Sequence, residues 1–179
     1  GYPINSNGDE NGLTLTANGT YAFFASNKLN GQGGFDIYTF ELPPALRPHE
    51  VTYVKGNVYD AVTKQPLESA VEIVDLVKNL PVYQDYSSAD QGDFLATITT
   101  GKDYGLNIAR DGYLFYSANF SLAGHVNTEP FHITAYLQPI EVGNKVILKN
   151  IFFDTNKFDI KDESKPELQK LVDFLNLNK

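Results

Sequence analysis

Three histidines, His49, His125 and His132, are the side chains of this sequence best suited to metal binding or acid–base catalysis. A catalytic zinc site needs two histidines and a carboxylate close together, and neither His-x-x-Glu nor His-Glu-x-x-His occurs. The chain has no cysteine, and it has no Gly-x-Ser-x-Gly turn to present a nucleophilic serine. The sequence therefore predicts no catalytic residues, no metal site and no cofactor, and it favours histidines that lie at the surface or at a strand edge.

A second group of oxygen ligands lies in the loop Asn5–Gly12. Asn5, Asn7 and Asp9 occur at alternate positions, as calcium ligands do in some loops. The glycine is misplaced for an EF-hand, and no glutamate follows at the twelfth position. The pattern favours a connection between strands, with calcium binding as the open alternative.

The composition and charge of the chain indicate which classes of partner are poor candidates. The net charge of −8 is spread along the 179 residues without a basic patch, so nucleic acid and anionic membrane surfaces are poor candidates. No apolar run approaches the roughly 18 residues of a membrane-spanning helix. The 11 tyrosines and 12 phenylalanines favour strands. The chain has no methionine, so we expect a segment of a longer protein, and an upstream targeting or anchoring segment is left open.

Residues 1–42 are predicted to form three short antiparallel strands, over Asn11–Thr16, Tyr21–Ser26 and Phe35–Leu42. The stretches "NSNGDENGLTLTANGTYAFFASN" and "GGFDIYTFE" resemble a blade of TolB-like β-propellers. The resemblance implies the last blade of a propeller, and a blade needs neighbours to bury its faces. We therefore expect an exposed apolar face that contains some of Leu13, Leu15, Phe23, Phe24 and Ile37.

The proline-rich stretch Pro43–His49 is predicted to be a stiff, extended linker. Beyond it, residues 50–138 read as seven short strands separated by Gly, Asp, Asn or Pro, which indicates an antiparallel β-sandwich. The predicted strands are Val51–Tyr59, Ala70–Leu76, Val82–Ser87, Phe94–Thr99, Tyr104–Ala109, Leu114–Phe120 and Phe131–Leu137.

One motif in this region is specific. Residues Gly56–Leu67 follow the pattern G-x-V-x-D-x-x-T-x-x-P-L, and the surrounding stretch resembles the carboxypeptidase regulatory-like domain. That resemblance implies a transthyretin-like sandwich, an accessory module of many secreted and envelope proteins. Despite the family name, it implies no catalytic residues.

The C-terminal segment follows a second short linker at residues 139–144. Alternation over Lys145–Phe153 predicts a buried strand, and the residues after it predict a helix with an apolar stripe of Leu168, Leu171, Val172 and Leu175. Ser164 as N-cap and Glu167 three residues later form the pattern of a capping box. Residues 145–179 are thus predicted to be a strand–helix unit of α/β type.

The stretch "ILKNIFFDTNKFDIKDESKPELQKLVDFL" resembles the start of the OmpA-like domain, which binds peptidoglycan. In that family, the loop after the first strand begins with Phe-Asp, here Phe153 and Asp154, and contributes to a pocket for the stem peptide. The family's later "GHTD" motif and arginine do not occur in this sequence. The resemblance therefore implies a partial site, in a domain that is cut after its first helix. An equally weighted alternative is a structural role, in which Asp154 stabilises the loop and its negative charge complements the positive end of the helix dipole.

The fold class expected is mainly β: a propeller-blade remnant, a seven-stranded transthyretin-like sandwich and a truncated α/β unit. This order of modules is similar to that of OmpA-family envelope proteins of Bacteroidetes, including the periplasmic component associated with the type IX secretion system. The resemblance implies a non-catalytic, periplasmic, outer-membrane-associated scaffold. Its partners would be peptidoglycan, through the complete OmpA-like domain, and envelope or secretion-system proteins. The alternative is a carbohydrate- or protein-binding accessory module of a secreted hydrolase.

Overall fold

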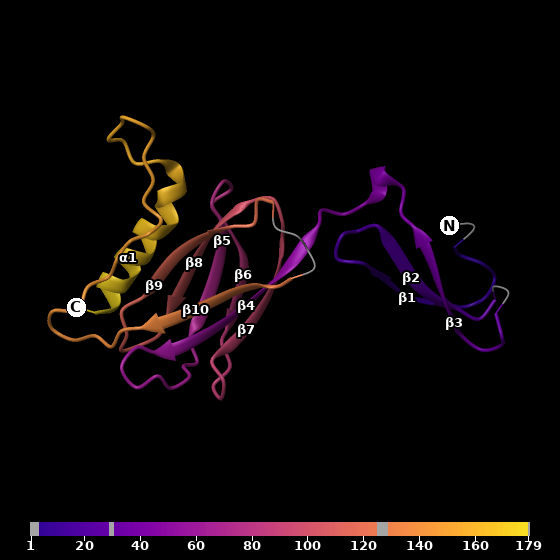
Figure 1. Cartoon of the computed structure of the whole chain (residues 1–179), viewed down its shortest axis with the longest axis horizontal. Helices are drawn as coiled ribbons and strands as arrows, with labels where there is room; N and C mark the ends of the chain where they lie inside the picture. Colours follow the sequence, from indigo (N-terminus) through magenta and orange to yellow (C-terminus); the bar gives the residue numbers. More distant parts are fainter. Residues whose placement is uncertain (1–3, 29–30, 125–128, 179) are drawn as a thin grey trace. The chain divides into compact units, whose positions relative to one another are not determined.

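The computed structural model describes residues 4–28, 31–124 and 129–178, and the chain divides into two compact units, Gly1–Val51 and Thr52–Lys179 (Figure 1). The described residues form ten strands in three sheets and one α-helix, so the predicted mainly β fold class is confirmed. No helix among these residues has the length and apolar character needed to cross a membrane.

The first unit is a three-stranded antiparallel sheet in the order β1-β2-β3, as predicted. Its strands are β1 (Glu10–Leu15), β2 (Tyr21–Ser26) and β3 (Asp36–Glu41). The turn between β1 and β2 is held by Asn18, whose Oδ1 accepts hydrogen bonds from the Thr16 hydroxyl at 2.7 Å and the Thr20 amide at 3.0 Å. Gly19 follows with φ +68°, a conformation that favours glycine. The predicted linker after β3 contains a short 3₁₀ turn, η1 (Pro44–Leu46).

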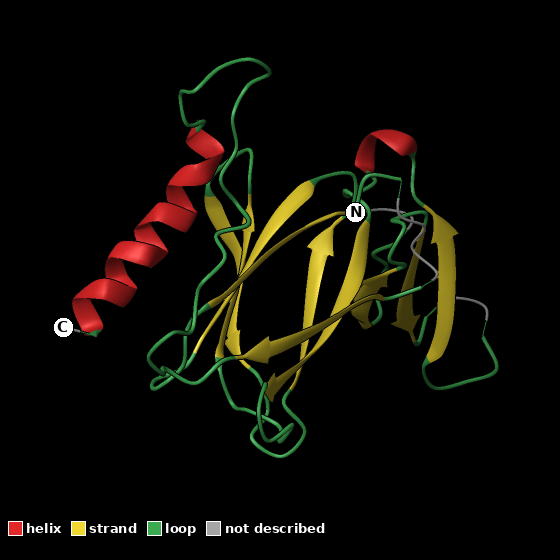
Figure 2. Ribbon diagram, turned by 60° about the vertical axis from the view of Figure 1, so that its left-hand side comes forward, coloured by secondary structure: helices red, strands yellow, loops and turns green. Residues whose placement is uncertain are grey.

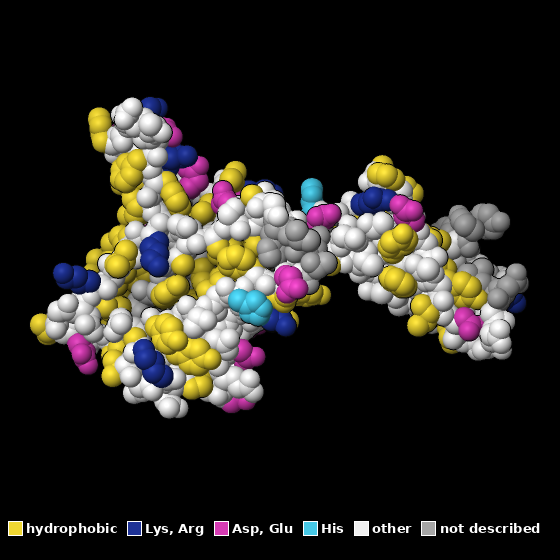
Figure 3. All heavy atoms as spheres, in the orientation of Figure 1, with side chains coloured by type: hydrophobic (Ala, Val, Ile, Leu, Met, Phe, Trp, Pro, Cys, Tyr) yellow, Lys and Arg dark blue, Asp and Glu magenta, His cyan; other side chains and the backbone are white. Residues whose placement is uncertain are grey.

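The two faces of this sheet differ in exposure. Phe24 is buried and lies against Tyr38 and Phe40, with ring centroids 5.8 and 6.1 Å away. Ile37, on the opposite face, is 80% exposed. Leu13 is 66% exposed and lies at the irregularity in the edge strand β1. Figure 3 shows hydrophobic side chains at the surface of this unit. The expectation of exposed apolar side chains is confirmed for Leu13, Leu15 and Ile37, but Phe24 is buried.

We predict that these exposed apolar side chains make the chain self-associate at high concentration. The double variant Leu13→Lys, Ile37→Lys should be more monomeric, because two exposed apolar side chains are replaced by charges at little expected loss of stability. Sedimentation velocity over a concentration series measures the effect. The matched control is Val62→Lys with Val77→Lys, since these two valines are exposed in the second unit. A parent chain that stays monomeric at millimolar concentration would contradict the prediction.

The second unit contains seven strands at the positions predicted, in two sheets ordered β10-β4-β7 and β6-β5-β8-β9. The strands are β4 (Val51–Asp60), β5 (Ala70–Asp75), β6 (Leu80–Tyr86), β7 (Asp93–Thr99), β8 (Asp103–Ala109), β9 (Tyr116–Ser121) and β10 (Phe131–Leu137). The prediction of a wholly antiparallel sandwich is wrong in one respect, because β10 pairs with β4 in parallel. The chain enters β10 from the other sheet, and alternation along a strand carries no information about strand direction.

Two fixed positions of the motif over Gly56–Leu67, Gly56 and Asp60, have structural roles. A side chain at Gly56 would collide with the ring of Phe94, which is buried in the core. The Asp60 carboxylate accepts hydrogen bonds from the amides of Val62 and Thr63 and from the Tyr113 hydroxyl, and these bonds lower its pKa. The motif therefore fixes a turn and the close approach of two strands, which is a role in folding.

The tail packs on the four-stranded sheet and belongs to the second unit (Figure 2). It ends in η2 (Asp162–Ser164) and helix α1 (Lys165–Leu177). Phe174 of the helix meets Phe115 edge to face at 5.6 Å, and the Lys170 ammonium lies 2.7 Å from the Glu72 carboxylate of β5. Much of the predicted apolar stripe points to solvent instead, with Val172 and Leu175 exposed.

Two local predictions for the tail are wrong. Residues 145–153 form no strand, and Phe153 makes only a single bridge with Ile160. Ser164 is the N-cap, but its hydroxyl accepts a hydrogen bond from the Phe152 amide at 2.8 Å and does not cap the helix. Glu167 is buried and accepts a hydrogen bond from the Asn150 side chain at 3.0 Å. The pair therefore attaches the helix to the preceding segment, because long-range partners outcompete the local capping bonds.

Candidate functional site

The predicted site residues Phe153 and Asp154 lie at the start of an exposed loop before helix α1. The Phe153–Ile160 bridge and the hydrogen bond from the Lys161 amide to the Phe152 carbonyl, at 3.0 Å, close this loop. Phe153 is 51% exposed, and Phe158 in the same loop is also exposed. The loop thus presents aromatic side chains and one carboxylate to solvent.

The Asp154 carboxylate already has cationic neighbours. The Lys157 ammonium lies 3.4 Å from one of its oxygens, and the Lys161 ammonium lies 3.8 Å from the other. Asp154 and Lys157 are exposed and Lys161 is partly exposed, so each of these pairs contributes little in water. A ligand ammonium could therefore replace these lysines at small cost.

The other residues considered from the sequence do not come together. His49 and His132 are exposed in different units, and His125 lies outside the described residues. In the loop Asn5–Gly12, Asp9 exchanges hydrogen bonds with Asn27, which joins the loop to the end of β2. Within residues 4–28, 31–124 and 129–178, no group of three or more His, Cys, Asp or Glu side chains could hold a metal ion.

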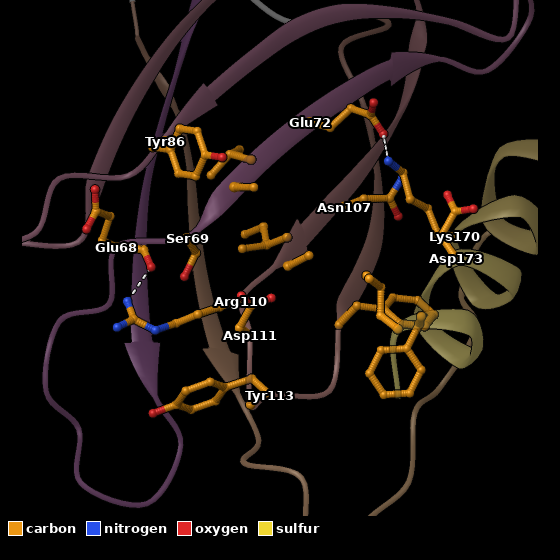
Figure 4. A pocket seen from close by; sticks show the side chains of 18 of the residues that line it. Glu68, Ser69, Glu72, Tyr86, Asn107, Arg110, Asp111, Tyr113, Lys170 and Asp173 are labelled. Atoms are coloured by element: carbon orange, nitrogen blue, oxygen red, sulfur yellow. Dashed lines mark hydrogen bonds and ion pairs between the residues drawn. The ribbon is translucent and has the colours of Figure 1, made fainter. Parts of the chain in front are cut away.

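A larger feature of the second unit was not predicted. A cleft of about 1220 Å³ lies between the outer face of β6, β5 and β8 and the last turns of helix α1 (Figure 4). Its floor includes a row of paired strand positions, in which Glu72 of β5 lies opposite Gln84 of β6 and Asn107 of β8. In a neighbouring row two alanines, Ala70 and Ala109, face each other. Small side chains at this place leave the space that the cleft occupies.

The cleft contains polar side chains, and some of their atoms lack hydrogen-bond partners. Glu72 accepts a hydrogen bond from the Gln84 side chain at 2.7 Å, and its other oxygen forms an ion pair with the Lys170 ammonium at 2.7 Å. Asn107 is 5% exposed and Ser69 is 1% exposed, yet Asn107 Oδ1 and Ser69 Oγ have no hydrogen-bond partner. Buried polar atoms without partners are uncommon, because leaving one unsatisfied costs about 1–3 kcal/mol. These two oxygens therefore mark the cleft as a candidate binding site.

The sequence carried a weak signal for this cleft. Glu72 and Asn107 interrupt strands that are otherwise rich in apolar residues, and a polar outward position on a solvated sheet is ordinary. Their spatial relation depends on the pairing of β5 with β8, two strands that are not adjacent in the sequence. The helix that completes the cleft comes from the end of the chain, so no local pattern connects it with these strands.

No protein-family model and no curated protein matches this chain. Among solved structures it is similar to S.CueP, with 12% identity, a TM-score of 0.39 and coverage of 72% of this chain and 78% of that chain. The group B streptococcus pilus 2b backbone protein matches at 15% identity and a TM-score of 0.42, over 67% of this chain and 50% of that one. A streptococcal ancillary pilin matches at 13% identity and a TM-score of 0.37, over 66% and 45%. Similarity at this level carries no argument about function.

Proposed function

We propose that this chain is a non-catalytic binding part of an envelope scaffold protein that attaches an outer-membrane or secretion assembly to peptidoglycan. The observation that supports the proposal is the exposed loop that begins at Phe153 and Asp154. The Phe-Asp pair is the element expected to contribute to a stem-peptide pocket. In this role Asp154 would accept the ammonium group of the stem peptide, and the ring of Phe153 would cover its aliphatic part.

The exposed apolar side chains of the first unit support the scaffold half of the proposal. Leu13 and Ile37 lie on a small sheet and are more than half exposed. Such a surface is suited to contact with another protein or with a neighbouring module. The chain would then contribute two separate contacts, one in each unit.

Binding to peptidoglycan should require more than this chain. A stem peptide carries both an ammonium and a carboxylate, and burying either of them unpaired would cost several kcal/mol. Asp154 offers only the acidic partner, and in the described residues its loop is held by few contacts. Sedimentation with purified peptidoglycan should therefore leave residues 1–179 in the supernatant. A longer protein, with roughly a hundred residues added to complete a domain, should sediment.

Within that longer protein, Asp154→Ala should weaken retention, because the ammonium of the stem peptide loses its carboxylate. Asp90→Ala is the matched control, since Asp90 is an exposed aspartate in a turn of the sandwich. Retention of residues 1–179 that is insensitive to Asp154→Ala would place the contact elsewhere and refute the role of this loop.

A further inference from the structure

We propose that the cleft between helix α1 and the outer face of β5, β6 and β8 binds an extended peptide segment of a partner protein through a lysine side chain. This site is separate from the Phe153–Asp154 loop, since neither residue lines the cleft. The inference is therefore independent of the role proposed for that loop.

The first argument is an ammonium group that the chain itself places in the cleft. The Lys170 ammonium lies 2.7 Å from a Glu72 oxygen (Figure 4). The other Glu72 oxygen accepts a hydrogen bond from Gln84. The Glu72 side chain is only 17% exposed, so this acceptor is fixed in a partly dry environment. This part of the cleft thus already holds a primary ammonium, and both Glu72 oxygens are engaged.

The second argument concerns the two buried oxygens without partners. An ammonium offers three N–H donors and no acceptor, so it suits a site whose unused polar atoms accept hydrogen bonds. Asn107 Oδ1 can only accept, and the Ser69 hydroxyl oxygen has free lone pairs. Both atoms are covered in the free chain. A ligand ammonium that reached either oxygen would satisfy a group that is otherwise unpaired.

The third argument is charge. The cleft is lined by five acidic and two basic residues, a stronger acidic excess than the 22 to 14 of the whole chain. Glu68 and Asp111 lie at the exposed rim, and their carboxylates have no ion pair with any described residue. Acidic rims attract cationic partners and repel acidic ones, and this effect weakens as salt screens the charges.

The size and the walls of the cleft favour a peptide over a free amine. Its volume of about 1220 Å³ is above the range of about 300–1,000 Å³ that is common for small-molecule sites. Tyr86, Tyr113 and Phe174 line it and offer apolar surface for the aliphatic stem of a lysine. Arg110 donates to the Glu68 carbonyl and keeps further N–H groups that can bond to the backbone carbonyls of a peptide.

The test uses the whole chain, labelled for NMR, and the blocked peptide acetyl-Ala-Lys-Ala-Lys-Ala-amide. We expect saturable binding in which the side-chain amide signals of Asn107 move, with an affinity that falls as salt is raised. The same peptide with glutamate in place of lysine should not bind. Spermidine, a free amine without a peptide backbone, should bind more weakly than the lysine peptide.

The double variant Glu68→Gln, Asp111→Asn should weaken binding of the lysine peptide by about fivefold, because two exposed carboxylates are lost from the rim. Both residues are exposed and unpaired, so folding should be unaffected. The control is Asp90→Asn with Glu141→Gln, an equal change of charge at exposed positions that do not line the cleft. Equal weakening by both pairs, equal binding of the glutamate peptide, or an unmoved Asn107 signal would overturn the proposal. Spermidine that binds as tightly as the peptide would make this a small-amine site and overturn the peptide assignment.

Discussion

Gly92→Ala should lower the free energy of unfolding of the second unit by about 3 kcal/mol or more. Gly92 is buried just before β7 and has φ +67°, a conformation in which a side chain is strained. A Cβ there would lie 2.2 Å from the backbone oxygen of Val58. That oxygen cannot easily move, because it accepts a hydrogen bond from the Leu67 amide at 2.9 Å, and the Gly92 carbonyl in turn accepts from the Val58 amide at 2.8 Å. The new methyl group therefore forces apart strands that the sandwich needs in contact.

The variant Gly101→Ala separates the two causes of this loss, which are the strain of a positive φ and the collision with the Val58 oxygen. Gly101 has φ +76°, but no atom lies within 4 Å of the Cβ that alanine would add. It should therefore show only the conformational cost, roughly 1–2 kcal/mol. Calorimetry of both variants and the parent chain measures the difference. If Gly92→Ala proves no more damaging than Gly101→Ala, the close contact with Val58 is not rigid.

The second large effect is expected at Asn150, which joins the tail to the sheet. Its buried amide nitrogen lies 3.0 Å from the Ser117 hydroxyl, 3.1 Å from the Ala118 carbonyl and 3.0 Å from the Glu167 carboxylate. Asn150→Ala would leave the buried carboxylate without its donor, a loss of about 2–4 kcal/mol. Because these bonds attach helix α1 and its preceding segment, the helix should detach before the sandwich unfolds.

Hydrogen exchange of the backbone amides in Lys165–Leu177 measures that detachment, and exchange there should be faster in Asn150→Ala than in the parent chain. The matched control is Asn119→Ala, which removes the hydrogen bond to the neighbouring Lys149 carbonyl at 3.0 Å. This contact is exposed, so water can replace it, and the change should be about 1 kcal/mol or less. Equal protection of the helix in both variants would show that apolar contacts such as Phe115–Phe174 hold the helix alone.

The sequence predicts some features of this structure better than others. The strand positions in both units follow from alternation and from turn residues such as Asn18 and Gly19, and all ten expected strands of residues 1–138 are formed. The exposure of Asp154 could also be expected, since polar residues after an apolar run indicate a loop, but Phe153 was predicted to end a buried strand and is exposed. Local patterns are sufficient there because the burial of each side chain depends on its position within its own strand or turn.

The tail and the cleft were decided by tertiary structure. Ser164 and Glu167 have the spacing of a capping box, but Asn150 and Phe152 offer them buried partners, and a hydrogen bond away from water outweighs an exposed local one. The cleft exists because β5 and β8 pair across about thirty residues of sequence, a separation typical of sandwich strands, and because helix α1 closes it. Local sequence patterns are sufficient to place the strands and turns of residues 1–138. Strand order, the parallel pairing of β10 and the place of the helix depend on contacts between distant segments, which no local pattern encodes.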